Sequence, residues 1–167
     1  MSPESASEPG KWRTRSYQRG IMDAITEGAY ERVTVKKSAR VGYTKIINAG
    51  IGYHIHHDPC GQLVVQPTIE DAGGYSKEEI APMLRDSPCF AGLVSDPKSR
   101  DSNNTVAKKA YPGGILNLIG ANSARGFRRL TVRIVWFDEI DGFPPSAGQE
   151  GDQLALGEKR AADAWNR

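Results

Sequence analysis

Apolar residues recur at helical spacing in several segments of the chain, and each of these segments is predicted to be a helix. In the first of them, residues 16–30, Ser16 is placed to cap the N-terminus and Gly28 to help end the helix. The same spacing predicts further helices over residues 43–57, 68–88 and 153–165.

The segment 68–88 contains two signals that bear on where its helix begins and ends. Gly73-Gly74 is expected to split an otherwise continuous helix, because glycine lowers helix stability by about 1 kcal/mol relative to alanine. Ser76 and Glu79 then have the spacing of a capping box, in which the two side chains satisfy backbone N–H groups at a helix start.

Short β-branched and apolar runs predict the strands. Residues 105–120 indicate a hairpin around a Pro-Gly-Gly turn, and residues 130–141 form the strongest strand pattern in the chain. Strands that alternate with helices favour an α/β fold with a mostly parallel sheet flanked by helices, and ligands of such sheets bind beyond the carboxyl ends of the strands. The remaining predicted strands are residues 33–37 and 62–67.

Length and composition are those of one globular domain of 167 residues with a net charge of +2. No apolar stretch approaches the roughly 20 residues that span a bilayer, so no membrane association is expected. Residues 1–10 are polar and are expected to form a disordered tail ahead of a domain over residues 11–167. Basic runs at 11–19, 36–40 and 125–129 leave nucleic-acid binding open, since such binding depends on local patches of charge.

Residues 37–44 come close to the phosphate-loop pattern G-x-x-x-x-G-K-[ST]. Gly42 and Thr44 stand where the pattern requires them, whereas Tyr43 takes the lysine position and Lys37 takes the position of the first glycine. Backbone N–H groups of a tight loop before a helix can bind phosphates, and a lysine at either end of the loop can supply the positive charge. The alternative is a basic junction that binds no ligand.

The predicted strand 130–141 carries Asp138 and Glu139 next to each other. In P-loop ATPases an acidic residue at this point holds Mg²⁺ and an adjacent glutamate orients the attacking water. Strands also end in acidic turn residues without any function. The two segments together favour a nucleotide site, because they occur in the order that one such site requires.

The segment KKSARVGYTK (36–45) resembles the deviant Walker A motif of the lambda-like phage terminase large subunit (GpA) family, whose members carry a lysine at the first position. The likeness covers almost all of residues 10–160 in order. It continues in YQRGIMDAI, HDPCGQLVVQPT, SKEEIAPMLRDSP, YPGGILNLIGANSA and FDEIDGFPPSAGQEGDQLALGEKR.

The resemblance implies a role for each matching position. Asp138 would hold Mg²⁺ together with Thr44, and Glu139 would position the hydrolytic water. Gln18 resembles an adenine-reading glutamine, with Trp12 and Tyr17 beside the base. Lys37 and Lys45 would contact phosphates. The implied nucleotide-binding loop consists of Lys37, Ser38, Ala39, Arg40, Val41, Gly42, Tyr43, Thr44 and Lys45.

The resemblance also implies a P-loop NTPase of the ASCE type, with ATP and Mg²⁺ as cofactors, in a motor that packages phage DNA. Implied partners are double-stranded DNA, the terminase small subunit, the portal and procapsid, and further copies of the chain, in the host cell cytoplasm. The ATPase domain is expected to be incomplete at its C-terminus and to lack the nuclease domain, so the isolated chain is expected to be weakly active or inactive. The arginine that completes a neighbour's site stays open among Arg40, Arg125, Arg128 and Arg129.

Two other functions remain open at this point. One is a helicase-like translocase ATPase, although such enzymes place a lysine at the position of Tyr43. The other is a non-catalytic fragment that binds DNA or other terminase subunits and has lost its phosphate-binding lysine. A metal site in HIHHDPC (54–60) is not favoured, because the spacing of its ligand types fits no standard zinc pattern.

Overall fold

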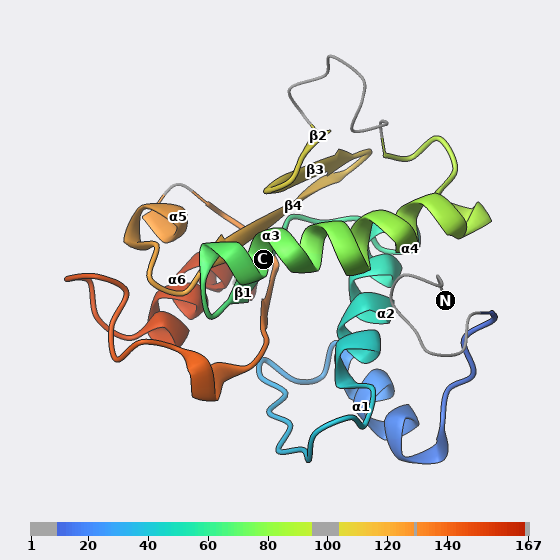
Figure 1. Ribbon diagram of the computed structural model, residues 1–167, viewed down its shortest axis with the longest axis horizontal. Coiled ribbons are helices and arrows are strands. Elements are labelled where there is room, and N and C mark those ends of the chain that lie inside the picture. The colour runs from blue at the N-terminus through green and yellow to red at the C-terminus, as the bar shows by residue number, and fades with distance from the viewer. Residues whose placement is uncertain (1–9, 95–103, 129, 166–167) are drawn as a thin grey trace.

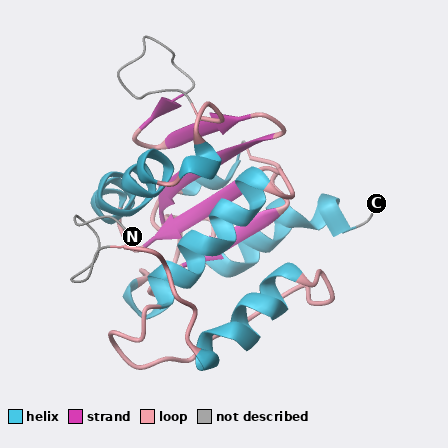
Figure 2. Ribbon diagram, turned by 90° about the vertical axis from the view of Figure 1, so that its right-hand side faces the viewer, coloured by secondary structure: helices cyan, strands magenta, loops and turns pink. Residues whose placement is uncertain are grey.

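The computed structural model describes residues 10–94, 104–128 and 130–165, which form a sheet with helices on both faces (Figure 1). Figure 2 shows the same layers from the side, with the strands between two sets of helices. The predicted tail lies outside the described residues except for Gly10. Within the described part of the chain, no helix combines the length and the apolar character needed to cross a bilayer.

The sheet has five strands in the order β2-β3-β4-β1-β5 and is mixed rather than mostly parallel. β1 pairs in parallel with β4 and β5, whereas β2, β3 and β4 pair antiparallel. The predicted hairpin explains the difference: Pro112-Gly113 connects β3 to β4, and a connection this short can only join antiparallel strands. The strands are β1 Gln62–Gln66, β2 Asn104–Thr105, β3 Lys108–Tyr111, β4 Gly114–Gly120 and β5 Ile134–Phe137.

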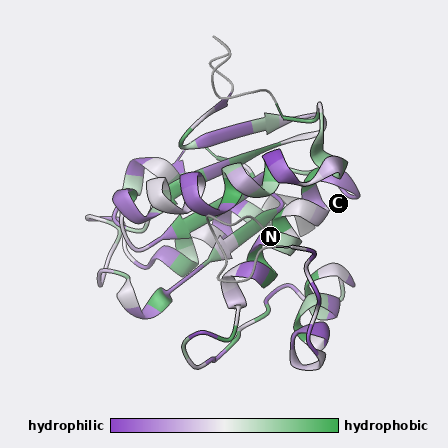
Figure 3. Ribbon diagram, turned by 45° about the vertical axis from the view of Figure 1, so that its right-hand side comes forward, coloured by the Kyte–Doolittle hydropathy of each residue, from purple (hydrophilic) through white to green (hydrophobic). Residues whose placement is uncertain are grey.

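The interior strand β1, which lies between β4 and β5, is buried along its whole length, and its side chains alternate between two cores. Val64 packs with α2 (Tyr43–His56) and with the helical segment that contains α3 (Ile69–Tyr75) and α4 (Ala81–Asp86). Leu63 and Val65 pack on the opposite face with α5 (Ala124–Arg128) and α6 (Gln153–Trp165). In Figure 3 hydrophobic residues predominate on the inner strands of the sheet, whereas the strands at its upper edge contain hydrophilic residues.

Helices α1, α2 and α6 lie within the segments that the sequence predicts to be helical. The first, α1, covers Ser16–Thr26, shorter than predicted, and Gly28 follows it with a left-handed φ of +66°. Ser16 is the first helical residue rather than the cap, which is Arg15. Two 3₁₀ turns, Pro88–Phe90 and Ile140–Gly142, complete the described elements.

Residues 33–37 do not form the predicted strand. The alternation of Val33 and Val35 with polar residues fits a strand, but Val33 is exposed, so the segment has no buried face to hold it against the sheet. The strand predicted over residues 130–141 is likewise reduced to Ile134–Phe137, the part that pairs with β1.

Gly73-Gly74 does not split the third helix, and Ser76 does not cap one. The capping box is made instead by Thr68 and Asp71 at the start of α3. The helix then runs without a break into a π-helical turn, Ser76–Ile80, and on into α4. Burial of Ala72 and Tyr75 on either side of the glycines stabilises the helix enough to outweigh their low helix propensity.

Helix α2 approaches β5 very closely at Gly50. A Cβ atom at Gly50 would lie 2.5 Å from Cη2 of Trp136, a separation that real Cβ atoms do not show. The indole Nε1 of Trp136 also donates to Oε1 of Gln62 at 2.9 Å, which fixes the ring against the helix. The absence of a side chain at Gly50 therefore allows the helix to lie directly on the indole.

We expect Gly50→Ala to destabilise the fold by about 1–3 kcal/mol, because overpacking against Trp136 outweighs the gain in helix propensity. Gly20→Ala in α1 is the matched control, since its added Cβ would meet nothing within 4 Å and should stabilise by about 0.5–1 kcal/mol. Urea unfolding of the two variants measures the difference. Equal effects of the two substitutions would contradict the close contact.

Candidate functional site

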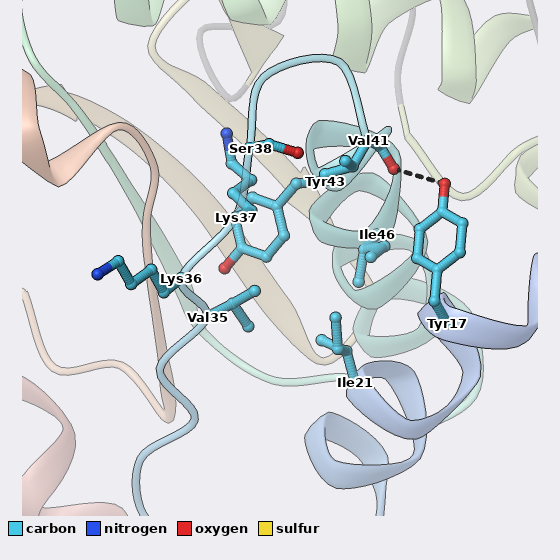
Figure 4. A pocket seen from close by; sticks show the side chains of 9 residues that line it. All are labelled: Tyr17, Ile21, Val35, Lys36, Lys37, Ser38, Val41, Tyr43 and Ile46. Carbon is cyan, nitrogen blue, oxygen red and sulfur yellow. Dashed lines mark hydrogen bonds between the residues drawn. The ribbon is translucent and has the colours of Figure 1, made fainter.

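The loop before α2 is held in a conformation that depends on Gly42. Gly42 is the N-cap of the helix and has a left-handed φ of +73°, which glycine adopts without steric cost. A Cβ there would also lie 3.1 Å from Nε2 of Gln18. Helix α1 braces the loop, since Tyr17 Oη donates to the Val41 carbonyl at 3.1 Å (Figure 4). Gln18 Nε2 donates to the same carbonyl at 3.3 Å.

Lys37 lies beside Tyr43 rather than extending freely into solvent. Its ammonium nitrogen is 5.5 Å from the centroid of the Tyr43 ring, within the range of a cation–π contact, and Figure 4 shows the two side chains together. Burial raises the pKa of the Tyr43 phenol, and the negative charge of Asp138 raises it further. Tyr43, which takes the lysine position of the phosphate-loop pattern, is thus in contact with Lys37.

Asp138 follows β5 directly and is the buried carboxylate of the site. Its backbone N–H donates to the Val65 carbonyl, and its Oδ1 accepts from the N–H of Glu139 at 3.1 Å. Burial raises the pKa of Asp138, while a hydrogen bond from Gln66 and the positive charge of Lys37 act in the opposite direction. The positive charge of Lys37 therefore acts on the carboxyl group of Asp138.

Glu139 is exposed and has a left-handed backbone, with φ 52° and ψ 47°. This conformation is unfavourable for a residue with a Cβ, by roughly 1–2 kcal/mol. Such strain persists where the surrounding structure imposes it and is frequent at functional sites. Here it turns the chain sharply after β5, so that the side chains of Asp138 and Glu139 lie in different environments, one buried and one exposed.

Lys45 is engaged away from the loop, in a largely buried ion pair with Glu79. Its side chain is 16% exposed and that of Glu79 is 18% exposed. Asn48 also donates to Glu79, at 2.7 Å, and accepts from the hydroxyl of Tyr75 at 2.5 Å. Sequence reasoning placed Glu79 in a capping box and missed this pair, since no local pattern links residues 34 positions apart.

The side chain of Gln18 is nearly completely buried, and its amide is fully engaged. Its Oε1 accepts from the Arg15 N–H at 2.9 Å, and its Nε2 reaches the Val41 carbonyl. Trp12 lies apart, with Nε1 donating to Thr14 Oγ1.

A pocket of about 260 Å³ opens between the segment 35–38 and the two helices α1 and α2 (Figure 4). It brings together several residues of the predicted nucleotide-binding set. The predicted metal and catalytic residues Thr44, Asp138 and Glu139 do not line it, and neither do Gln18 and Trp12. The residues of the predicted set that line it are Tyr17, Lys37, Ser38, Val41 and Tyr43.

Among the arginines considered at the sequence level, Arg40 is the one on the loop, exposed and with a left-handed φ of +61°. Arg125 and Arg128 lie on α5, where Arg128 forms an ion pair with Glu150. Arg129 falls outside the described residues. Of these side chains, only that of Arg40 belongs to the loop that contains Lys37.

The oxygen donors at the site fit a magnesium ion. Mg²⁺ binds carboxylate, hydroxyl and water oxygens and uses one or two carboxylates together with phosphate oxygens. Asp138 supplies a buried carboxylate whose charged form is disfavoured by burial, so a cation beside it would relieve that cost. Thr44, in the first turn of α2, would supply the hydroxyl.

Comparison with known proteins gives a consistent set of relatives. A family model described as the ATPase domain of the phage terminase large subunit gpA matches residues 6–167. The terminase large subunits of Enterobacteria phage P21 and Escherichia phage lambda are each 34% identical to the chain over 161 residues, which is 96% of this chain. The chain spans about a quarter of the length of these curated relatives (25% of each). No solved structure matches it.

The strain at Glu139 predicts a difference between two substitutions. Glu139→Asn should be more stable than Glu139→Ala by about 1 kcal/mol, because asparagine tolerates the left-handed region and alanine does not. Both variants lack the carboxylate, so they serve as matched controls for each other. Chemical denaturation measures the difference, and equal stabilities would show that the left-handed turn is not imposed at this position.

Because the pKa of Asp138 is raised, we expect Asp138→Asn to increase the stability of the fold by an amount that depends on pH. The folded state holds this proton more tightly than the unfolded state, whose ordinary pKa is 3.8, so deprotonation costs folding free energy as the pH rises through that window. The neutral asparagine avoids this cost, and the variant should therefore be more stable at neutral pH. The difference in stability between the variant and wild type should disappear below the ordinary pKa, where Asp138 is protonated in both the folded and the unfolded state.

Thermal unfolding of wild type and Asp138→Asn at neutral and acidic pH, with a metal chelator present, tests this expectation. A variant that is less stable at neutral pH, or a gap that widens in acid, would show that Asp138 is not destabilised by its burial.

Proposed function

This chain belongs to the family of ATPase domains of the phage terminase large subunit gpA, and we propose that it binds ATP with Mg²⁺ and hydrolyses it between the loop 37–44 and the carboxylates that follow β5. The observation that carries the proposal is the loop at the N-terminus of α2, where Lys37 lies 5.5 Å from the centroid of the Tyr43 ring and its positive charge acts on the buried carboxyl group of Asp138. Asp138 lies just beyond the carboxyl end of the parallel strand β5, where ligands of such sheets bind, and a cation near a carboxylate is what a nucleoside triphosphate and its metal require.

The loop is proposed to bind the phosphates mainly through its backbone. N–H groups of Ser38, Ala39, Arg40, Val41, Gly42 and Tyr43 would lie at the N-terminus of α2, where the helix dipole also favours an anion. Lys37 would leave the face of Tyr43 to contact the phosphate oxygens. Lys45 could join it only by exchanging Glu79 for phosphate, so Lys37 is the principal cation of the proposal.

Thr44 and Asp138 would hold the magnesium ion. Bound there, Mg²⁺ neutralises charge on the phosphate oxygens. Glu139 would accept a hydrogen bond from the attacking water and orient it toward the terminal phosphate. Its exposure at the turn after β5 suits a residue that must reach a water molecule rather than the metal.

The base is proposed to lie near Tyr17, at the pocket between the loop and α1. Gln18 would read adenine only by giving up the Val41 carbonyl, which it holds in this structure. Trp12 would have to move toward the base, since it does not line the pocket. Adenine recognition would thus be coupled to the conformation of the loop, because the same glutamine braces it.

We extend the proposal to the longer protein that the relatives represent. The domain would adopt the P-loop NTPase fold of the ASCE type and power the packaging of double-stranded DNA into a procapsid, in the host cytoplasm. Further copies of the chain, the terminase small subunit and the portal would be its partners. An arginine of a neighbouring copy would complete each site, and the isolated chain would hydrolyse ATP slowly.

Binding of a non-hydrolysable ATP analogue with Mg²⁺, measured by isothermal titration calorimetry, tests the site. Lys37→Ala should weaken binding by about 10-fold to 100-fold, the range for loss of a hydrogen bond to a charged group. Lys159→Ala is the matched control, because Lys159 is exposed on α6 and does not line the loop pocket. Tyr43→Ala should weaken binding less, since it removes only the support for Lys37.

Circular dichroism spectra of all the variants establish that each remains folded. If wild type and Lys37→Ala bind the analogue equally, the proposal that Lys37 contacts the phosphates is wrong. If none of the folded proteins binds it, a non-catalytic DNA- or subunit-binding role replaces the ATPase proposal.

A further inference from the structure

A second pocket, of about 450 Å³, lies between the π-helical turn and the strands at the opposite edge of the sheet from β5. Ser76, Lys77 and Ala81 line it from the helix, and Thr105, Val106 and Lys109 line it from β2, β3 and the turn between them. The pocket shares no residue with the loop pocket of the proposed nucleotide site. The two pockets are therefore separate cavities.

Lys109 is a buried cation that has no carboxylate partner in the part of the chain that the structure describes. It is 3% exposed and shares a face of β3 with Tyr111, which packs in the core beneath α2 and α3. Its ammonium donates to the Thr105 carbonyl, and within the described residues no acidic side chain forms an ion pair with it. Burial lowers the pKa of Lys109, because removing an unpaired ammonium from water disfavours its charged form.

Ser76 adds a buried donor from the other wall of the pocket. It is 1% exposed, and its hydroxyl oxygen has no hydrogen-bond partner among the described residues. A serine inside a helix normally bonds to a preceding carbonyl, so an unpartnered buried hydroxyl is a cost to the fold. Ser76 also begins the π turn, and π turns frequently mark functional sites.

One ligand would satisfy both the ammonium of Lys109 and the hydroxyl of Ser76. A phosphate oxyanion accepts hydrogen bonds from an ammonium and from a hydroxyl, and its charge compensates the buried cation. Lys77, exposed at the rim, adds a second positive charge. We propose that the pocket between the π turn and β2–β3 is an oxyanion site that takes a phosphate group.

A phosphate group can come from the backbone of DNA or from free inorganic phosphate, and the pocket holds one feature that bears on the source. Ala81 and the exposed Val106 give it an apolar side, against which a deoxyribose next to the bound phosphate can pack. The proposal does not depend on the nucleotide site, since none of its residues belongs to that site.

The test uses the whole 167-residue chain, labelled with ¹³C at lysine, and variants of the two buried groups. Inorganic phosphate is titrated at constant ionic strength while the Lys109 side-chain resonance is followed by NMR. We expect a saturable shift of this resonance in wild type that is weakened several-fold in Ser76→Ala. In parallel, fluorescence anisotropy measures binding of a short labelled DNA duplex over a range of salt concentrations.

If the source is DNA, Lys109→Met weakens duplex binding and lowers the slope of log affinity against log salt by about 1, as loss of one phosphate contact requires. Lys108→Met is the matched control, because the neighbouring residue lies on the other face of β3. If the source is free phosphate, the NMR shift is present and the duplex data of the two lysine variants agree. Each of these results supports an oxyanion site.

Thermal unfolding distinguishes a loss of phosphate binding from a loss of folded structure. Ser76→Ala and Lys109→Met each remove a polar group that is costly to bury, so both should keep or raise the Tm. The proposal is overturned if phosphate gives no saturable shift and the lysine variants bind DNA alike, or if both variants lose stability together with binding. Binding of the ATP analogue by Lys109→Met should be unchanged, so failure of one proposal is distinguishable from failure of the other.

Discussion

The contact between Gly50 and Trp136 sets the geometry on which the candidate site depends. Helix α2 begins at the loop 37–42, and β5 ends just before Asp138, so the distance between loop and carboxylate follows from how α2 lies on β5. The absent side chain at Gly50 lets the helix rest on the indole, which Gln62 of the interior strand β1 holds in place. The arrangement of the site is therefore a property of the core.

The site itself is costly to the fold. The buried carboxylate of Asp138 has a raised pKa, and both Arg40 and Glu139 have left-handed backbones. Positions of this kind lower stability and persist where function requires them. The molecule compensates for them in its core, where Val64 and Leu63 of the fully buried β1 pack against helices on both faces.

Three lysines illustrate how the surroundings of a charge decide its role. Lys45 is neutralised by Glu79 and contributes to the packing of α2 against the π turn. Lys37 lies over the ring of Tyr43, and its charge acts on the buried carboxyl group of Asp138. Lys109 is buried and forms no ion pair with a carboxylate of the described residues. In sequence they appear alike, since each follows or precedes another polar or basic residue in a short run.

The sequence by itself determined the features that depend on local pattern: the helices around residues 43–57 and 153–165, the hairpin at Pro112-Gly113, and the loop and acidic pair of the candidate site. Tertiary structure alone decided the rest. Residues 33–37 have strand character but no buried face, and the helix through Gly73 continues because its neighbours are buried. The pairing of Lys45 with Glu79 joins distant positions. Periodicity and propensity describe what a segment prefers, whereas burial and pairing depend on which segments meet, and that choice is made over the whole chain.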